Sequence, residues 1–171
     1  MSFDKALPVI LAAEGGFSDD RADPGGRTNF GITQATYDAW RTKHGEPAAD
    51  VKDIPEDTVA AIYRFEYWLA GRCDRLPWPL ALVHFDGCVN HGLDRAARLL
   101  QEVAGVAVDG KIGPLTIAAV SAAPLRMASA LITRRRGFYA DIPKRRPQSA
   151  KFLPGWLRRM DHLAKACGVL A

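Results

Sequence analysis

The chain has 171 residues, of which 48% are hydrophobic and 25% are charged, a composition typical of one globular domain that can bury a core. It contains no apolar run near the roughly 18–20 residues that a membrane span needs, and its N-terminus lacks the basic segment of a signal peptide. These features exclude a membrane-inserted protein and predict synthesis in the cytoplasm.

The charge is unevenly distributed along the chain. The net charge is +4, but residues 126–171 hold eleven Lys/Arg and two acids, whereas residues 1–125 hold twelve Lys/Arg and seventeen acids. A basic C-terminal third favours an anionic polymer as partner, and the alternative is a basic helix that is merely solvated. No motif that reads nucleic acid accompanies the arginines, so we expect no nucleic-acid partner.

The cysteine pattern predicts neither a disulfide framework nor a metal site. Cys73, Cys88 and Cys167 are widely spaced and odd in number. They form no Cys-x-x-Cys pair and no Cys/His cluster at the usual zinc spacing. We therefore expect reduced thiols in the core, no metal and no cofactor.

The first predicted helix, residues 3–14, ends at a lone carboxylate. Leu7, Leu11 and Glu14 share one helical stripe, and two glycines follow directly. A carboxyl beside apolar side chains takes up a proton more easily, as a general acid must at neutral pH. The alternative is that Glu14 caps the helix or pairs with an arginine.

A glycine-rich segment, residues 17–31, follows this helix and predicts a short hairpin or an irregular loop. Asp23 precedes Pro-Gly-Gly, which is turn chemistry, and turn formation is one role for its carboxylate. Asp23 also stands nine residues after Glu14. Two carboxylates in one compact polar stretch are the minimum that cleavage of a glycosidic bond requires.

The rest of the chain predicts helices divided by proline and glycine. The expected ranges are 34–44 with Thr33 as N-cap, 55–69, 80–90, 94–104, a helix begun by Pro114, 124–140 and 154–167, with a basic loop at 143–150. Residues 80–90 are apolar nearly all round, which predicts the buried central helix. Asp86 and Asn90 interrupt it on one face, where they either tie down a loop or line a cleft.

Several segments, in order along the chain, resemble one family. They are Glu14-Gly15-Gly16-Phe17, Ala22-Asp23-Pro24-Gly25-Gly26-x-Thr28-Asn29-x-Gly31-Ile32-Thr33 and Phe85-Asp86-x-x-Val89-Asn90-x-Gly92. These resemble glycoside hydrolase family 108, the lysozyme-like N-acetylmuramidases of phage endolysins and bacterial cell-wall proteins. Two later segments, Asp109-Gly110-x-Ile112-Gly113-Pro114-x-Thr116 and Phe152-x-x-Gly155-Trp156-Leu157-x-Arg159, resemble its companion peptidoglycan-binding segment.

The resemblance implies a mainly α, lysozyme-like helical fold with a small β-hairpin or loop at the active-site cleft. It implies a catalytic region at residues 1–92 and a helical peptidoglycan-binding-like region at 93–171, packed on the same globule. The family's catalytic acid corresponds to Glu14. Its members usually carry an acid after Tyr-Trp, where this chain has Leu69, which leaves Asp23 as the second carboxylate.

Five further residues complete the predicted site. Thr28 stands one residue earlier than the threonine of phage-type lysozymes and is a third catalytic candidate. The candidates for gripping acetamido sugars are Asn29, Trp68, Asp86 and Asn90, although an aromatic residue such as Trp68 more often lies in a core.

The implied function is a monomeric muramidase that cleaves the β-1,4 bond between N-acetylmuramic acid and N-acetylglucosamine, acting as an endolysin on peptidoglycan. Such an enzyme would be made in the bacterial or host cytoplasm and would reach the wall through a holin-like pore or by lysis. The alternatives are a lytic transglycosylase and a non-catalytic wall-binding or secretion-activating protein.

Overall fold

The computed structural model describes residues 2–19 and 26–169. These residues form eight α-helices and one small hairpin, so the predicted mainly α fold is confirmed. The elements in chain order are α1 (Ser2–Leu11), β1 (Thr28–Asn29), β2 (Ile32–Thr33), α2 (Gln34–Lys43), α3 (Glu56–Ile62), α4 (Leu80–His91), α5 (Leu93–Ala104), α6 (Pro114–Ser121), α7 (Pro124–Arg145) and α8 (Leu153–Cys167). Among them run three short 3₁₀ turns, Val51–Asp53, Cys73–Arg75 and Pro147–Phe152, and one π-helical stretch, Tyr63–Leu69.

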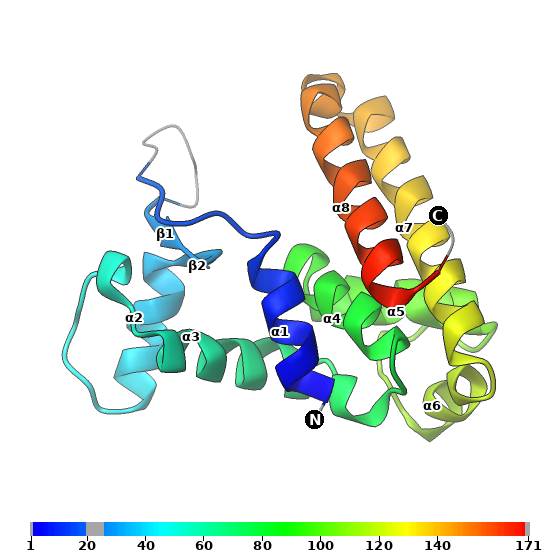
Figure 1. Cartoon of the computed structure of the whole chain (residues 1–171), viewed down its shortest axis with the longest axis horizontal. Helices are drawn as coiled ribbons and strands as arrows, with labels where there is room; N and C mark the ends of the chain where they lie inside the picture. Colours follow the sequence, from blue (N-terminus) through cyan, green and yellow to red (C-terminus); the bar gives the residue numbers. More distant parts are fainter. Residues whose placement is uncertain (1, 20–25, 170–171) are drawn as a thin grey trace.

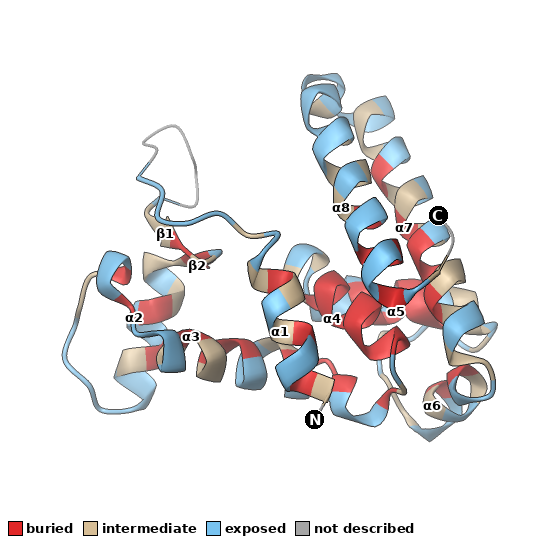
Figure 2. Cartoon of the chain, in the orientation of Figure 1, coloured by how far each residue is buried: buried red, intermediate tan, exposed pale blue. Residues whose placement is uncertain are grey.

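Helix α4 lies at the centre of the molecule, as its apolar sequence predicts. Residues 80–88 are all buried, and α1, α5, α7 and α8 pack around the helix. Figure 2 shows this buried centre, with exposure increasing towards the far ends of α7 and α8. The central helix is therefore the element on which both halves of the chain rest.

The two halves lie on opposite sides of α1 (Figure 1). The hairpin, α2 and α3 form one side, and α5 to α8 form the other, where α7 and α8 make an antiparallel pair. An aromatic cluster joins α1 to the centre, because Trp68 packs edge-on against Phe3 and Phe85 with ring centroids 5.6 and 5.2 Å away. Such aromatic pairs add to the stabilisation from buried area.

Two helix ends differ from the predictions. Helix α1 ends at Leu11, and Glu14 lies in the turn that follows it. In this turn Ala13 N donates to Ile10 O, a hydrogen bond of the 3₁₀ type that is common at helix ends. Helix α7 runs to Arg145 and includes Pro143, where a loop was expected. A proline removes one hydrogen bond from a helix, and here the helix ends less than one turn after Pro143.

No single helix among residues 2–19 and 26–169 is long and apolar enough to cross a membrane. Only α6 and α7 taken together reach that length and composition, and they are bent by 106°.

Candidate active site

Glu14 lies just beyond α1, at the junction of the helix, the hairpin and α8. Its backbone N–H donates to Ile10 O and Leu11 O, each at 3.2 Å, so the helix end orients the residue. Its side chain is 18% exposed. The carboxylate is therefore within reach of a bound molecule while its position is determined by secondary structure.

A guanidinium holds this carboxylate from the other end of the chain. Arg159 of α8 donates from Nη2 to Glu14 Oε1 at 2.9 Å. The alternative that the sequence left open for Glu14, pairing with an arginine, is what the structure contains.

Asp86 anchors Arg159 from the buried side. Its side chain is 1% exposed. Its Oδ1 accepts a hydrogen bond from Nε of Arg159 at 2.7 Å, and its Oδ2 accepts one from Nη2 of Arg135 at 2.6 Å. Burial alone raises the pKa of Asp86, but the charges of Arg135 and Arg159 outweigh it and hold the pKa below its usual range. Glu14, Arg159, Asp86 and Arg135 together form what we call the ion network, in which two acidic side chains contact two guanidiniums.

Arg135 completes the ion network in the core, although it is only 1% exposed. It donates to Val83 O at 3.1 Å, to Nε2 of His91 at 3.3 Å and to Tyr139 Oη at 3.4 Å. Burial and the nearby Arg135 lower the pKa of His91 to about 4, so this histidine is neutral and accepts the hydrogen bond. His91 is thus a structural partner of the ion network.

The hairpin turn approaches Glu14 from the opposite side. Asn29 pairs with Ile32, and the two central residues, Phe30 and Gly31, have φ of 50° and 73°, the pattern of a tight type I′ hairpin. A Cβ at position 31 would lie 2.7 Å from Glu14 Oε2. Only glycine therefore permits this approach of the turn to the carboxylate.

Tyr63 fixes the turn in that place. Its hydroxyl donates to Phe30 O at 2.8 Å. Burial and the nearby Glu14 raise the pKa of Tyr63, so the phenol keeps its proton and remains a donor. Tyr63 begins the π-helical stretch, a feature frequent at functional sites.

The other two predicted catalytic residues, Asp23 and Thr28, follow Glu14 in the sequence. Thr28 is in β1, where its backbone pairs with that of Ser18 at 2.8 and 2.9 Å, which ties the segment after Glu14 to the hairpin. Asp23 lies outside the described residues.

The four predicted sugar contacts divide by exposure. Asn29 is 7% exposed and donates to Val51 O and Lys52 O, so it holds the hairpin against the next turn. Trp68 (4% exposed) lies in the aromatic cluster and Asp86 in the ion network. These three side chains are occupied inside the protein, which corrects the prediction of direct sugar contact for them. Asn90 is exposed at the end of α4 and donates to Asp86 O at 2.8 Å.

A surface hollow of about 660 Å³ adjoins the site through Tyr67. Its walls include Thr36 and Trp40 of α2, Tyr67 of the π-helical stretch and Leu93 of α5, and Glu14 does not line it. Burial, then Glu66 and Glu14, raise the pKa of Tyr67, which places its phenol within electrostatic reach of the acid. The volume suits a small ligand.

The sequence prediction missed Arg135 and Arg159 as parts of the site. A signal was present, because each stands on the buried stripe of its helix. Arg135 stands four residues from Leu131 and four from Tyr139, and Arg159 follows Trp156 by three residues. A charged residue at an inward position predicts a buried partner.

Each half of the chain matches one known family. The chain matches the family described as "Glycosyl hydrolase 108" over residues 7–92 and the family described as "Predicted Peptidoglycan domain" over residues 95–161. The chain belongs to the glycosyl hydrolase 108 family.

A solved structure agrees over nearly the whole chain. The structure of Brucella abortus SagA is 34% identical, covers 98% of this chain and 94% of that chain, and superposes with a TM-score of 0.81. A search of curated proteins returned no match. The predicted lysozyme-like helical class is confirmed by this likeness together with the family match.

Proposed function

We propose that this protein is an N-acetylmuramidase, which hydrolyses the β-1,4 bond between N-acetylmuramic acid and N-acetylglucosamine in peptidoglycan. The observation that carries the proposal is the position of Glu14. A partly exposed carboxylate is held between a guanidinium and a glycine turn, at the meeting point of both halves of the chain. The match to a peptidoglycan domain supports the choice of polymer.

In this mechanism Glu14 protonates the oxygen of the leaving sugar and becomes a carboxylate as the bond breaks. Arg159 is already placed to stabilise that carboxylate, and Asp86 holds Arg159 in position. Charges fixed before the reaction stabilise the transition state without reorganisation. The ion network is therefore balanced when Glu14 has given up its proton.

Asp23 is the proposed second carboxylate, and Thr28 is the third proposed catalytic residue. Asp23 would stay ionised and orient the attacking water. A separation of roughly 6.5–9.5 Å between the two carboxyl groups would give inversion at the anomeric carbon, and about 5 Å would give retention. Asn90 and the hollow beside Tyr67 are the proposed contacts for the acetamido sugars.

We further propose that the enzyme serves as an endolysin, made in the cytoplasm and released to the wall. Hydrolase and peptidoglycan domain matches on one chain support this role. Expression in bacteria should lyse the cells when a pore-forming protein is co-expressed. Lysis without the pore would contradict the proposed dependence on it.

The central test is mass analysis of the fragments that the purified protein releases from peptidoglycan sacculi. Wild type should release muropeptides with a reducing N-acetylmuramic acid, and Glu14→Gln should lose at least about 10³-fold in rate, since the amide cannot donate the proton. Glu46→Gln is the matched control, because Glu46 is an exposed acid that pairs with Arg41 after α2.

The products separate the alternatives. Anhydro-muramic ends would identify a lytic transglycosylase, and binding without release would identify a wall-binding protein. Release by Glu14→Gln at the wild-type rate would overturn the assignment of the acid.

A further inference from the structure

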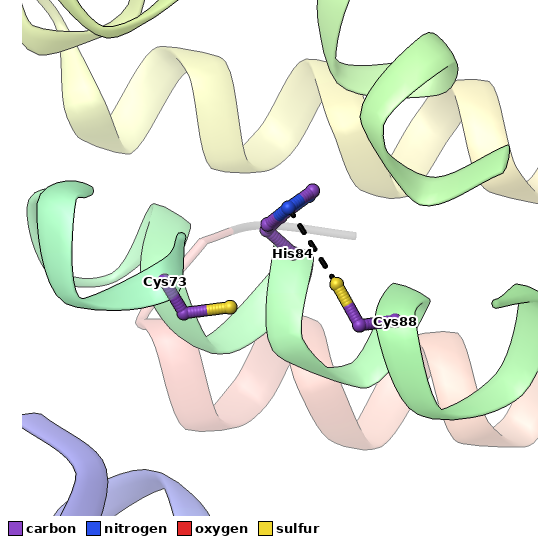
Figure 3. A group of neighbouring side chains, drawn as sticks. All are labelled: Cys73, His84 and Cys88. Carbon is purple, nitrogen blue, oxygen red and sulfur yellow. Dashed lines mark hydrogen bonds between the residues drawn. The ribbon is translucent and has the colours of Figure 1, made fainter. Parts of the chain in front are cut away.

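Three potential metal ligands meet in the core. Cys73 begins the 3₁₀ turn Cys73–Arg75, and His84 and Cys88 stand one turn apart on α4. Their ligand atoms all lie within 4.8 Å of one another, and His84 Nε2 is 3.6 Å from Cys88 Sγ. Figure 3 shows the three side chains converging. All three are buried.

The donor set selects the kind of ion. Two sulfurs and one imidazole nitrogen suit zinc and do not suit magnesium or calcium, which take oxygen ligands. Zinc bonds of about 2.3 Å to sulfur and about 2.0 Å to nitrogen imply a nitrogen–sulfur separation of about 3.5 Å in a tetrahedral site. The observed 3.6 Å matches that edge.

A fourth donor lies beside the histidine. The carbonyl oxygen of Gly71 is 3.0 Å from His84 Nε2. We propose that Cys73, His84 and Cys88 bind one zinc ion, with the Gly71 carbonyl as the fourth ligand. Since four protein ligands close the coordination sphere, the site is structural rather than catalytic.

A further feature of the structure fits a bound ion. The backbone at Gly71 lies close to both thiols, because a Cβ there would lie 2.6 Å from Cys88 Sγ and 3.4 Å from Cys73 Sγ. The absence of a side chain at position 71 thus lets the backbone approach the cluster.

The ion has a route into the site and a role once bound. A hollow of about 320 Å³, lined by Gly71, Arg72 and His84, reaches the histidine of the cluster. Zinc would join the turn after the π-helical stretch to α4, the helix that carries Asp86. It would therefore stabilise the centre of the fold without taking part in the chemistry of Glu14.

The first test measures metal content in the full chain purified from zinc-supplemented medium. Mass spectrometry of metals should find about one zinc per chain, as one closed site requires. Cys73→Ser and Cys88→Ser should each lose most of that zinc. Cys167→Ser is the matched control, because Cys167 is also buried but its Sγ contacts Pro79 O, and it should keep the ion.

The second test uses only the wild type, so its result does not depend on whether the cysteine variants fold. Cobalt loaded into the wild type should give the intense thiolate-to-metal absorption of a tetrahedral site. Removal of zinc by a chelator should lower the wild-type Tm by about 5–10 °C, and zinc should restore it. Wild type without bound zinc in zinc excess, a Tm unchanged by chelation, or a Cys73–Cys88 disulfide found by mass spectrometry would each overturn the proposal.

Discussion

Glu14 is held by two contacts of different kinds. Arg159 attracts one carboxylate oxygen electrostatically, and Gly31 leaves just enough space for the other. The first contact favours the charge that develops when the proton leaves, and the second determines where the carboxylate stands. In the proposed mechanism catalysis depends on both contacts, because a displacement of about 1 Å of a reacting group can cost roughly 10²-fold in rate.

Gly31→Ala should therefore reduce activity far more than stability. The added methyl meets Glu14 Oε2 at 2.7 Å and displaces the carboxylate, and the positive φ of 73° adds roughly 1–2 kcal/mol of strain. We expect at least a 10-fold loss in rate of muropeptide release with a Tm decrease of only a few degrees. Gly45→Ala is the control, since Gly45 has φ of 69° and no atom near its added Cβ. Equal losses of activity in both variants would contradict this role of Gly31.

His91 should make the protein less stable in mild acid. Its pKa falls from 6.5 to about 4 on folding, so between these values the unfolded chain binds more protons than the folded chain. The contribution of His91 to the free energy of unfolding is fully present above pH 6.5. Between pH 7 and pH 5 the free energy of unfolding should fall by roughly 1–2 kcal/mol. Denaturant unfolding at several pH values across this range measures the fall.

The variant His91→Gln should flatten that pH dependence, because glutamine does not titrate. His162→Gln, a change at an exposed histidine of α8, should leave the slope as in the wild type. A wild-type slope in His91→Gln would show that another group is responsible.

At the scale of elements, one buried side chain organises the connection between α5 and α6. Gln101 is 1% exposed and donates to Asp109 Oδ1 at 2.7 Å and to Lys111 O at 3.0 Å, while its own oxygen accepts from Gly110 N at 2.8 Å. One glutamine thus replaces the hydrogen bonds that this loop cannot make with itself. The loop lies within the match to the peptidoglycan domain.

Gln101→Leu should destabilise the protein by roughly 2–3 kcal/mol, because several hydrogen bonds are lost at once. The Tm should fall by about 4–12 °C. If this loop contributes to wall binding, co-sedimentation with sacculi should weaken as well. Ser121→Ala, which removes one exposed hydrogen bond to Ile117 O on α6, is the control. An unchanged Tm in Gln101→Leu would contradict the organising role.

At the scale of the whole molecule, the two family matches do not correspond to two independent units. Asp86 belongs to the segment matched as glycosyl hydrolase, while both of its guanidinium partners, Arg135 and Arg159, lie in the segment matched as peptidoglycan domain. Helices α5, α7 and α8 also cover the buried surface of α4. The segment matched as glycosyl hydrolase therefore depends on the segment matched as peptidoglycan domain for charge balance and for its core.

A fragment of residues 1–92 should fail to fold by itself. Leaving Asp86 without its partners costs about 3–5 kcal/mol, a large part of a total stability of roughly 5–15 kcal/mol, before the exposed surface of α4 is counted. Circular dichroism and limited proteolysis of the fragment should show no cooperative transition, and co-expression with residues 93–171 should restore one. A cooperative transition in the fragment alone would contradict the prediction.

The sequence by itself determined the order of the helices, the buried centre and the place of the acid. Residues 80–88 are apolar nearly all round and are buried, as predicted. Thr33 is the N-cap of α2, as predicted, and its side chain accepts a hydrogen bond from Thr36 N. These features are local, because helical periodicity and capping depend on residues a few positions apart. The motif around Glu14 is local as well, which is why the family could be identified from it.

Only the tertiary structure decided what surrounds the acid and what the polar residues of the core do. The pair of Glu14 and Arg159 joins residues 145 positions apart, and the three ligand atoms of the Cys73, His84 and Cys88 cluster meet because a turn packs on α4. Asn29 and Trp68 carry the residue types of sugar contacts, yet they face inward. A sequence pattern records which side of a helix faces the core, but the partner found there depends on how distant elements pack.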